Sequence, residues 1–462
     1  MKIWDKRATF MRLTRGMECD RIATMKRKPV WALLPFAVLL AACAGMFAAG
    51  SVSMPAAFLA AGAVALCTGR EPFAERIKAF AEGMGHEDVM IMCMVFVLAG
   101  AFASAAKESG AVDAMVKVAQ TLVPVRFLAA GVFVVSCAVS LAVGTSCGTI
   151  AAVGPVAFAL AGAEGASLPV MAGAVVGGAM FGDNLSVISD TTIAATRTQK
   201  VAMREKFLAN LKPALAAAVA TGVFYLAIAP GAGAAGNAVA AFDARDFVLI
   251  APYIVVFAAA VAGVNVMAVL CAGTLLALAA GMACGAFGCG GAVDCVGKGI
   301  MSMTETLVVA LLAGGLFALV KKRGGIGVLV DGAGRFVKSP RSCEIAACVL
   351  TGTINLFTAN NTVAIVVAGP LAAEWRERTG ASARRIAGLL DTASCVVQGL
   401  IPYGAQVLIA TGIAKGFDAS FNVFALTGSL VYPVALASAV AVWIAIGAKR
   451  ERIPRNGKFP LA

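Results

Sequence analysis

Histidine is almost missing from this 462-residue sequence, in which His86 is the single example. Histidine is the commonest general base, and a serine nucleophile depends on such a base. Residues 144–148 read Gly-Thr-Ser-Cys-Gly and match the Gly-x-Ser-x-Gly nucleophile pattern, but that motif needs a strand–turn–helix setting and a histidine. We interpret the match as accidental and His86 as a solvated loop residue. A Gly-x-Gly-Asp motif is also lacking, so we predict that the protein is not an enzyme.

The shortage of histidine also argues against a metal centre. Of the 13 cysteines, three gather in one expected loop, namely Cys284, Cys289 and Cys295. Three thiols without a histidine make a poor zinc site. Most other cysteines lie inside apolar runs, where cysteine acts as a small core residue. We therefore predict no disulfide framework, no resident metal and no cofactor.

Charged residues are scarce as well, at 14% of the chain, whereas 60% is hydrophobic and the mean hydropathy is +0.89. A soluble chain of this length would form two or three domains with charged surfaces. Here the apolar runs reach the ~20 residues that cross a ~30 Å hydrocarbon core as a helix. The net charge of +13 sits in short loops beside these runs, as orientation signals do. The expected partner is therefore the lipid bilayer, and no nucleic acid.

The basic residues predict a topology for the twelve apolar segments, which are 29–49, 51–68, 88–106, 127–162, 168–199, 207–229, 248–264, 265–284, 305–320, 342–373, 387–411 and 421–447. Segment 342–373 has basic clusters on both sides, and the positive-inside rule places both in the cytoplasm. Such a segment is a re-entrant hairpin, and 127–162 has a similar length and a polar middle. Ten transmembrane helices and two hairpins remain, with both termini cytoplasmic.

The distribution of charge supports this topology. Of the 38 Lys and Arg residues, 32 fall in the clusters assigned to the cytoplasm, at 1–28, 69–87, 197–212, 321–341, 374–386 and 448–462. The other six fall in outer loops, so no basic residue is left for the middle of a span. We expect a multi-pass protein of the bacterial plasma (inner) membrane.

A weak internal repeat appears when the chain is aligned with itself 215 positions on, where Gly154-Pro155 meets Gly369-Pro370 and Ala172-Gly173 meets Ala387-Gly388. The topology makes the two halves inverted copies, an architecture that supports alternating access around a midplane site. The expected organisation is a cytoplasmic basic tail (1–28), two leading transmembrane helices (29–87), a first inverted repeat (88–229), connecting helices with an external loop (230–304), a second inverted repeat (305–447) and a cytoplasmic tail (448–462).

Polar residues interrupt both expected hairpins, with Thr145, Ser146 and Thr149 in the first and Asn360, Asn361 and Thr362 in the second. Non-helical backbone is tolerated at membrane depth only where protein or a water-filled cavity surrounds it. Opposed half-helix ends then present N–H groups and carbonyls to a small ion or an anionic group. Small polar residues also permit close helix packing, but two such breaks at corresponding positions favour ligand-binding tips.

Residues 181–192 carry two intramembrane acids, Asp183 and Asp190, which lie on one face if the helix is continuous. An ionised Asp at mid-bilayer costs ~2.5–3.5 kcal/mol on insertion scales. Neighbouring side chains add oxygen ligands suited to Na⁺, namely Asn184, Ser186, Ser189 and Thr191. A carboxylate there binds either a cation or a proton, which couples their exchange by competition. The alternative for Asp190 is a helix cap near the cytoplasmic face.

The corresponding segment of the second half is rich in amides rather than acids. Its candidate contacts to an organic substrate are Asp391, Ser394, Gln398, Tyr403 and Gln406. The two halves together suit a cation site beside a site for a polar or organic group.

Four motifs together resemble the NhaC-type Na⁺/H⁺ antiporter family over roughly residues 88–411, namely Gly-Thr-Ser-x-Gly-Thr, Phe-Gly-Asp-x-x-Ser-x-Ile-Ser-Asp-Thr-Thr, Asn-Asn-Thr-Val-Ala and Gln-Gly-Leu-Ile-Pro-Tyr-Gly. The resemblance implies an inverted repeat of spans and re-entrant hairpins. The sequence departs from the family at Cys147, where Trp is expected, and at Asn184, where His is expected. Some members of the family exchange carboxylates or move amino acids.

We therefore expect an all-α membrane protein with discontinuous helices that acts as a Na⁺/H⁺ antiporter. Na⁺ and H⁺ would be the transported ions, with no metal beyond that Na⁺. The alternative is a Na⁺- or H⁺-coupled amino-acid or carboxylate transporter on the same scaffold. A channel would share these motifs, and saturating, counter-ion-coupled flux separates it from a transporter. The substrate and the oligomeric state, a homodimer included, stay open.

Overall fold

The computed structural model of the chain describes residues 30–49, 53–122, 124–163, 165–186, 189–228, 243–262 and 264–447. Every regular element within these ranges is helical, as the composition predicted. The expected cytoplasmic tails, 1–28 and 448–462, lie outside the described residues. Two short 3₁₀ helices are η1 (Val30–Leu33) and η2 (Val125–Phe127). The α-helices are α2 (Leu34–Ala49), α3 (Met54–Cys67), α4 (Phe73–Met84), α5 (Glu87–Glu108), α6 (Ala111–Leu122), α7 (Leu128–Val143), α8 (Ser146–Ala163), α9 (Leu168–Leu185), α10 (Asp190–Gln199), α11 (Met203–Ala227), α12 (Ala244–Val261), α13 (Val266–Ala283), α14 (Cys289–Ser302), α15 (Thr304–Lys322), α16 (Gly325–Gly334), α17 (Pro340–Thr358), α18 (Asn361–Thr379), α19 (Ala383–Leu400), α20 (Ala405–Lys415), α21 (Val423–Gly428) and α22 (Val431–Gly447).

Seven helical stretches of the described ranges are long and apolar enough to cross a membrane, namely Glu87–Glu108, Ser146–Ala163, Leu168–Gln199, Met203–Ala227, Val266–Ala283, Thr304–Lys322 and Ala383–Lys415. Shorter apolar helices accompany them, among them α3, α7 and α22. The chain is accordingly a multi-pass membrane protein. The finer count of ten spans and two re-entrant hairpins stays a prediction.

Both expected hairpins are pairs of helices with a short break between them. Gly144 ends α7 in the left-handed conformation with φ of 74°, where glycine carries no Cβ penalty. Ala359 ends α17 in the same region with φ of 48°, which is unusual for a residue with a Cβ. Asn360 then caps α18 by accepting from the Val363 amide. The predicted interruptions at these two points are confirmed.

Two further apolar segments are also broken. Residues 168–199 divide into α9 and α10, and residues 387–411 fall in α19 and α20. Asp183 therefore lies in the last turn of α9, whereas Asp190 begins α10. The two acids do not share one face of a continuous helix, because the chain leaves the helical conformation between them.

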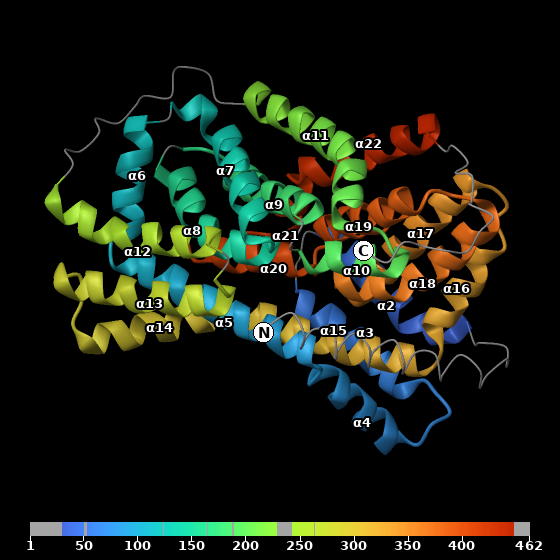
Figure 1. The fold of residues 1–462 in the computed structure, drawn as a ribbon. Coiled ribbons are helices and arrows are strands. Elements are labelled where there is room, and N and C mark those ends of the chain that lie inside the picture. The colour runs from blue at the N-terminus through green and yellow to red at the C-terminus, as the bar shows by residue number, and fades with distance from the viewer. Residues whose placement is uncertain are drawn as a thin grey trace.

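Helix bounds recur 215 positions apart across these breaks. Helices α9 and α19 begin at Leu168 and Ala383, and α10 and α20 begin at Asp190 and Ala405. The packing recurs as well, since α7 packs on α9 as α17 does on α19, and α8 packs on α20 as α18 does on α10. Figure 1 shows α10, α19 and α20 near the middle of the molecule, with α12 to α14 at one end and α16 to α18 at the other.

Two regions expected as loops contain helices. The basic region 69–87 holds α4, and the external loop with the cysteines holds α14. Glycines bring both helices close to a long apolar neighbour. A Cβ on Gly83 of α4 would lie 2.5 Å from the Gly314 carbonyl oxygen of α15, and one on Gly299 of α14 would lie 2.4 Å from the Gly100 carbonyl oxygen of α5. The loop predictions were wrong because these helices carry interspersed polar residues and form no long apolar run.

The crossing of α7 and α9 depends on Gly182. A Cβ at this position would lie 2.3 Å from the Ser140 Cβ and 2.5 Å from the Leu141 backbone nitrogen. We expect Gly182→Ala to force the helices apart and lower the free energy of unfolding by about 1–3 kcal/mol, which a lower melting temperature in detergent would report. Gly162→Ala is the matched control, because no atom lies within 4 Å of a Cβ there. Equal melting temperatures for the two variants would contradict this close crossing.

Candidate functional site

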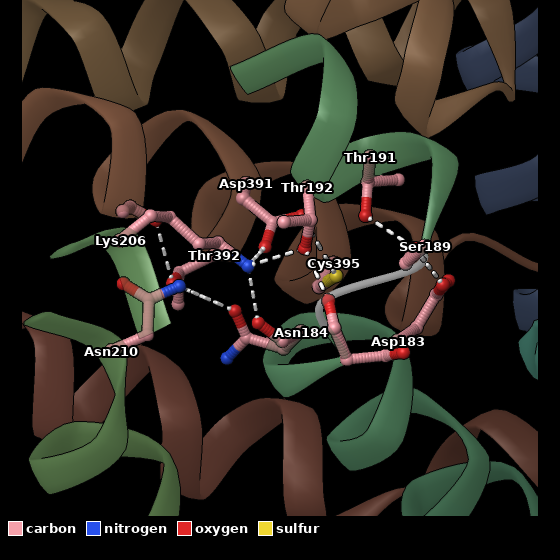
Figure 2. Close-up of polar contacts among 12 residues, drawn as sticks. Asp183, Asn184, Ser189, Thr191, Thr192, Lys206, Asn210, Asp391, Thr392 and Cys395 are labelled. Atoms are coloured by element: carbon pink, nitrogen blue, oxygen red, sulfur yellow. Dashed lines mark hydrogen bonds and ion pairs between the residues drawn. The ribbon is translucent and has the colours of Figure 1, made fainter. Parts of the chain in front are cut away.

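The broken helices bring polar side chains from both halves of the chain into the interior. Figure 2 shows them converging from α9, α10, α11 and α19. They form two groups that we treat separately. The Asp183 cluster comprises Asp183, Ser146, Ser189, Thr191 and Gln406. The Lys206 cluster comprises Lys206, Asp391, Asn184, Thr192, Asn210 and Thr392.

Asp183 is a buried carboxylate held by neutral donors. The residue is 6% exposed. Its Oδ1 accepts a hydrogen bond of 2.7 Å from Ser189 Oγ, and Oδ2 accepts one of 2.9 Å from Ser146 Oγ. Ser189 lies in turn 2.9 Å from the Thr191 hydroxyl. In the described part of the chain, no basic side chain forms an ion pair with Asp183. The charge of this carboxylate is therefore balanced only by hydroxyl dipoles.

A chain of hydrogen bonds connects Asp183 to the second half of the protein. Ser146 Oγ accepts from Gln406 Nε2 at 2.8 Å, and Gln406 Oε1 accepts from Gln398 Nε2 at 3.0 Å. Gln398 Nε2 also donates to the Ala359 carbonyl at 2.9 Å, where α17 ends. One network thus joins the breaks of both expected hairpins to the acid of the first half.

The other predicted tip residues have mainly local roles. Thr145 and Asn360 accept from backbone amides in the first turns of α8 and α18. Thr149 donates back to the Thr145 carbonyl, and Asn361 Oδ1 accepts from Asn355 Nδ2 at 3.4 Å. Thr362 is half-buried. These residues hold the breaks in shape, and Ser146 is the tip residue that reaches the carboxylate.

Lys206 is the centre of the second cluster, and its side chain is 0% exposed. The ammonium forms an ion pair with Asp391 and donates to the Asn184 carbonyl at 2.6 Å and to Thr192 Oγ1 at 2.7 Å. Figure 2 shows Nζ between these groups. An ammonium has three N–H donors. Two hydrogen bonds from it reach oxygen atoms here, and the carboxylate of Asp391 balances its charge.

The placement of Lys206 corrects the sequence-based topology. We assigned it to the cytoplasmic cluster 197–212 and left no basic residue within a span. Helix α11 already begins at Met203, so Lys206 lies in its first turn and points inward. The buried residues of α11 follow helical spacing, being Lys206, Asn210, Pro213, Ala214, Ala217, Thr221 and Tyr225. That i, i+4 pattern is the sequence signal that identifies Lys206 and Asn210 as inward-facing.

Asn184 forms hydrogen bonds with several members of the Lys206 cluster. Its side-chain Oδ1 accepts from Asn210 Nδ2 at 2.8 Å and from Thr392 Oγ1 at 3.1 Å. Asn210 can come this close because a Cβ on Gly388 would lie 2.2 Å from its Oδ1. Thr192 Oγ1 donates to the Ser186 carbonyl at 2.7 Å, across the break between α9 and α10. The sequence analysis missed Asn210, Thr192 and Thr392 because neutral polar residues on long helices are common.

The remaining predicted residues have other environments. Asp190 is exposed at the first position of α10, directly after the N-cap residue Ser189, so Asp190 is not itself the helix cap. Among the expected substrate contacts, Asp391 is paired with Lys206, Ser394 donates to the Asp391 carbonyl, and Tyr403 donates to the Leu356 carbonyl. A cavity of about 270 Å³ lies elsewhere, lined by α15, α20 and α21 residues that include the ion pair of Glu305 and Lys415.

Comparisons with known proteins identify the family that the sequence matches. The model of the Na⁺/H⁺ antiporter family matches residues 19–229 and again residues 226–447. The chain is 24% identical over 358 residues to the malate-2H⁺/Na⁺-lactate antiporter of Bacillus subtilis (strain 168), covering 71% of this chain and 75% of that protein. It is also 24% identical over 356 residues to the Na⁺/H⁺ antiporter NhaC of the same organism, covering 70% and 77%. A solved structure, that of the Alcanivorax borkumensis YdaH transporter, aligns at 15% identity over 81% of this chain and 87% of that one, with a TM-score of 0.40.

Proposed function

The chain belongs to the Na⁺/H⁺ antiporter family, and from that premise we propose that it exchanges Na⁺ for H⁺ by alternating access around Asp183. Its family makes it a secondary transporter and not an enzyme. The observation that carries the proposal is the environment of Asp183, a buried carboxylate that receives two hydroxyl hydrogen bonds and no basic partner within the described residues.

The chemistry follows from the cost of an isolated charge. An ionised carboxylate in the membrane interior is unfavourable unless a cation or a proton neutralises it. Ser146 and Ser189 place their oxygens 2.9 and 2.7 Å from the carboxylate of Asp183, which provides further hard ligands for Na⁺. A protonated carboxyl is a poor ligand for Na⁺. Na⁺ and H⁺ therefore cannot bind Asp183 at the same time, and this competition couples the movement of one ion to that of the other.

We also propose that the two halves are an inverted repeat. The 215-residue recurrence of helix bounds and the successive matches of the family model to both halves support this. The repeat would then extend beyond 88–229 and 305–447 to α2–α11 and α12–α22, because α4 and α14 also occupy corresponding places. In this register Gln398 stands 215 positions after Asp183. The first repeat would supply the carboxylate of Asp183, and the second repeat would supply the amide of Gln398 to the same hydrogen-bond network.

A carboxylate or amino-acid transporter is the second candidate function. One relative is a malate-2H⁺/Na⁺-lactate antiporter. Separately, the cavity of about 270 Å³ carries a carboxylate and an ammonium, from Glu305 and Lys415. In this alternative Gln398 and Gln406 would release one another and bind the carboxylate of an organic substrate. Na⁺ or H⁺ would then act as the coupling ion.

Asp183→Asn should abolish Na⁺-driven proton flux in proteoliposomes, because an amide can neither exchange a proton nor neutralise Na⁺. The melting temperature should stay near that of the wild type, since the amide has the same shape. Asp190→Asn is the matched control and should reduce the flux far less, because Asp190 is exposed. A folded Asp183→Asn protein with full exchange would remove this residue from the site.

The apparent affinity for Na⁺ should fall as pH decreases, because protons compete for the same carboxylate. Competition for a single site predicts a change approaching about one decade of affinity per pH unit at low pH. The measurement is Na⁺-driven proton flux between roughly pH 6 and 9 in vesicles free of organic solutes. No flux there, followed by flux when malate, lactate or an amino acid is added, would instead establish the second candidate.

The proposed hairpin of α17 and α18 predicts that both its ends face the cytoplasm. Lys338 precedes α17, Glu377 lies in the last turn of α18, and both are exposed. Cysteines at these positions should therefore react with a membrane-impermeant reagent only from that side. The background should lack Cys19 and the native cysteines that are exposed among the described residues, Cys67, Cys271 and Cys289. A cysteine at the exposed Ala419 should react only from the outside. Labelling of positions 338 and 377 from opposite sides would make this segment a span.

A further inference from the structure

The oxygen atoms around Lys206 Nζ have the composition of a cation site. They are a carboxylate oxygen of Asp391, the main-chain carbonyl of Asn184 and the hydroxyl of Thr192. They come from α19, from the last turn of α9 and from the first turn of α10. Carboxylate, carbonyl and hydroxyl oxygens are the ligands that hard cations prefer.

Two of these oxygens are free to face a cation for a structural reason. Asn184 is the second-last residue of α9, and the last carbonyls of a helix have no partner within it. Thr192 uses its hydroxyl proton on the Ser186 carbonyl, so it offers only a lone pair to Lys206. Both side chains of the ion pair, Lys206 and Asp391, are 0% exposed, so the ammonium is held without help from solvent.

The two buried acids of the interior therefore differ in one respect. Asp183 has hydroxyl donors and no basic partner among the described residues, whereas Asp391 has the ammonium of Lys206. An ion that must leave during transport cannot be tethered to the chain. Lys206 is tethered, and so the charge of Asp391 is balanced in every state in which the pair persists.

We propose that Lys206 is a tethered cation, which occupies at Asp391 a place that a second Na⁺ would otherwise take. The chain then binds one Na⁺, at Asp183. The proposal rests on the proposed function for the role of Asp183, but the occupation of the Asp391 site can be measured by binding alone. Lys206 is thus a residue that sets the number of bound cations, and it acts through Asp391.

Lys206→Met tests this directly. The methionine side chain keeps the apolar body but ends one atom short of Nζ, and it leaves the three oxygens in place. Titration calorimetry of the purified full chain with NaCl, at constant ionic strength in choline chloride, should give two bound Na⁺ per chain where the wild type gives one. The Na⁺ dependence of the melting temperature should steepen accordingly.

The double variant Lys206→Met/Asp391→Asn is the charge-matched control. It removes the ammonium and the carboxylate together, so it should bind one Na⁺ with an affinity close to that of the wild type. This variant also decides the matter if Lys206→Met does not fold with an unpaired acid. Loss of Na⁺ binding in the double variant would overturn the proposal, because the pair would then belong to the transported ion's own site.

The outcomes separate this inference from the proposed function. A folded Lys206→Met protein that still binds one Na⁺ overturns the tethered cation and leaves antiport at Asp183 standing. A wild type that binds no Na⁺, with one Na⁺ gained in Lys206→Met, overturns the role of Asp183 and supports the tethered cation.

Discussion

Within a bilayer, a polar group must find its partner inside the protein, and this constraint accounts for most of the interior of this molecule. In the described ranges four apolar helical segments are interrupted, and an interruption leaves helix-end carbonyls and amides without partners in their own helix. Side chains of the same protein form hydrogen bonds with these backbone groups. Thr145 and Asn360 cap the helices after two breaks, and Thr192 bridges a third by donating to the Ser186 carbonyl. The polar sequence at the breaks is therefore a structural requirement as well as a source of ligands.

Close helix crossings make this arrangement compact. Glycines at positions 83 and 314 bring α4 against α15, and glycines at positions 100 and 299 bring α5 against α14. Small residues permit such crossings because dispersion contacts, rather than hydrophobic burial, hold helices together in lipid. The two crossings involve helices at corresponding places in the chain. The same packing solution thus supports both halves around the central broken helices.

The interior contains two acids whose carboxylates have different partners. Asp391 forms an ion pair with Lys206, whereas Asp183 accepts hydrogen bonds from the hydroxyls of Ser146 and Ser189. A paired charge of this kind fixes structure, and its separation would leave two uncompensated ions. A carboxylate with neutral donors can accept and release a cation. The two environments therefore differ in their counter-charge, which is a tethered ammonium at Asp391 and only neutral hydroxyl donors, among the described residues, at Asp183.

The sequence by itself determined the all-helical membrane fold, the two hairpin breaks and the candidate acid Asp183, because apolar runs, glycines and intramembrane carboxylates are local features with few alternative explanations. It did not reveal α4 or α14, whose polar residues conceal their buried faces. It also misassigned Lys206, since charge counting treats every lysine near a span as solvated. Only the tertiary structure decided that Lys206 meets Asp391, 185 positions away in the chain. That pairing depends on the relative placement of α11 and α19, and no local pattern encodes it.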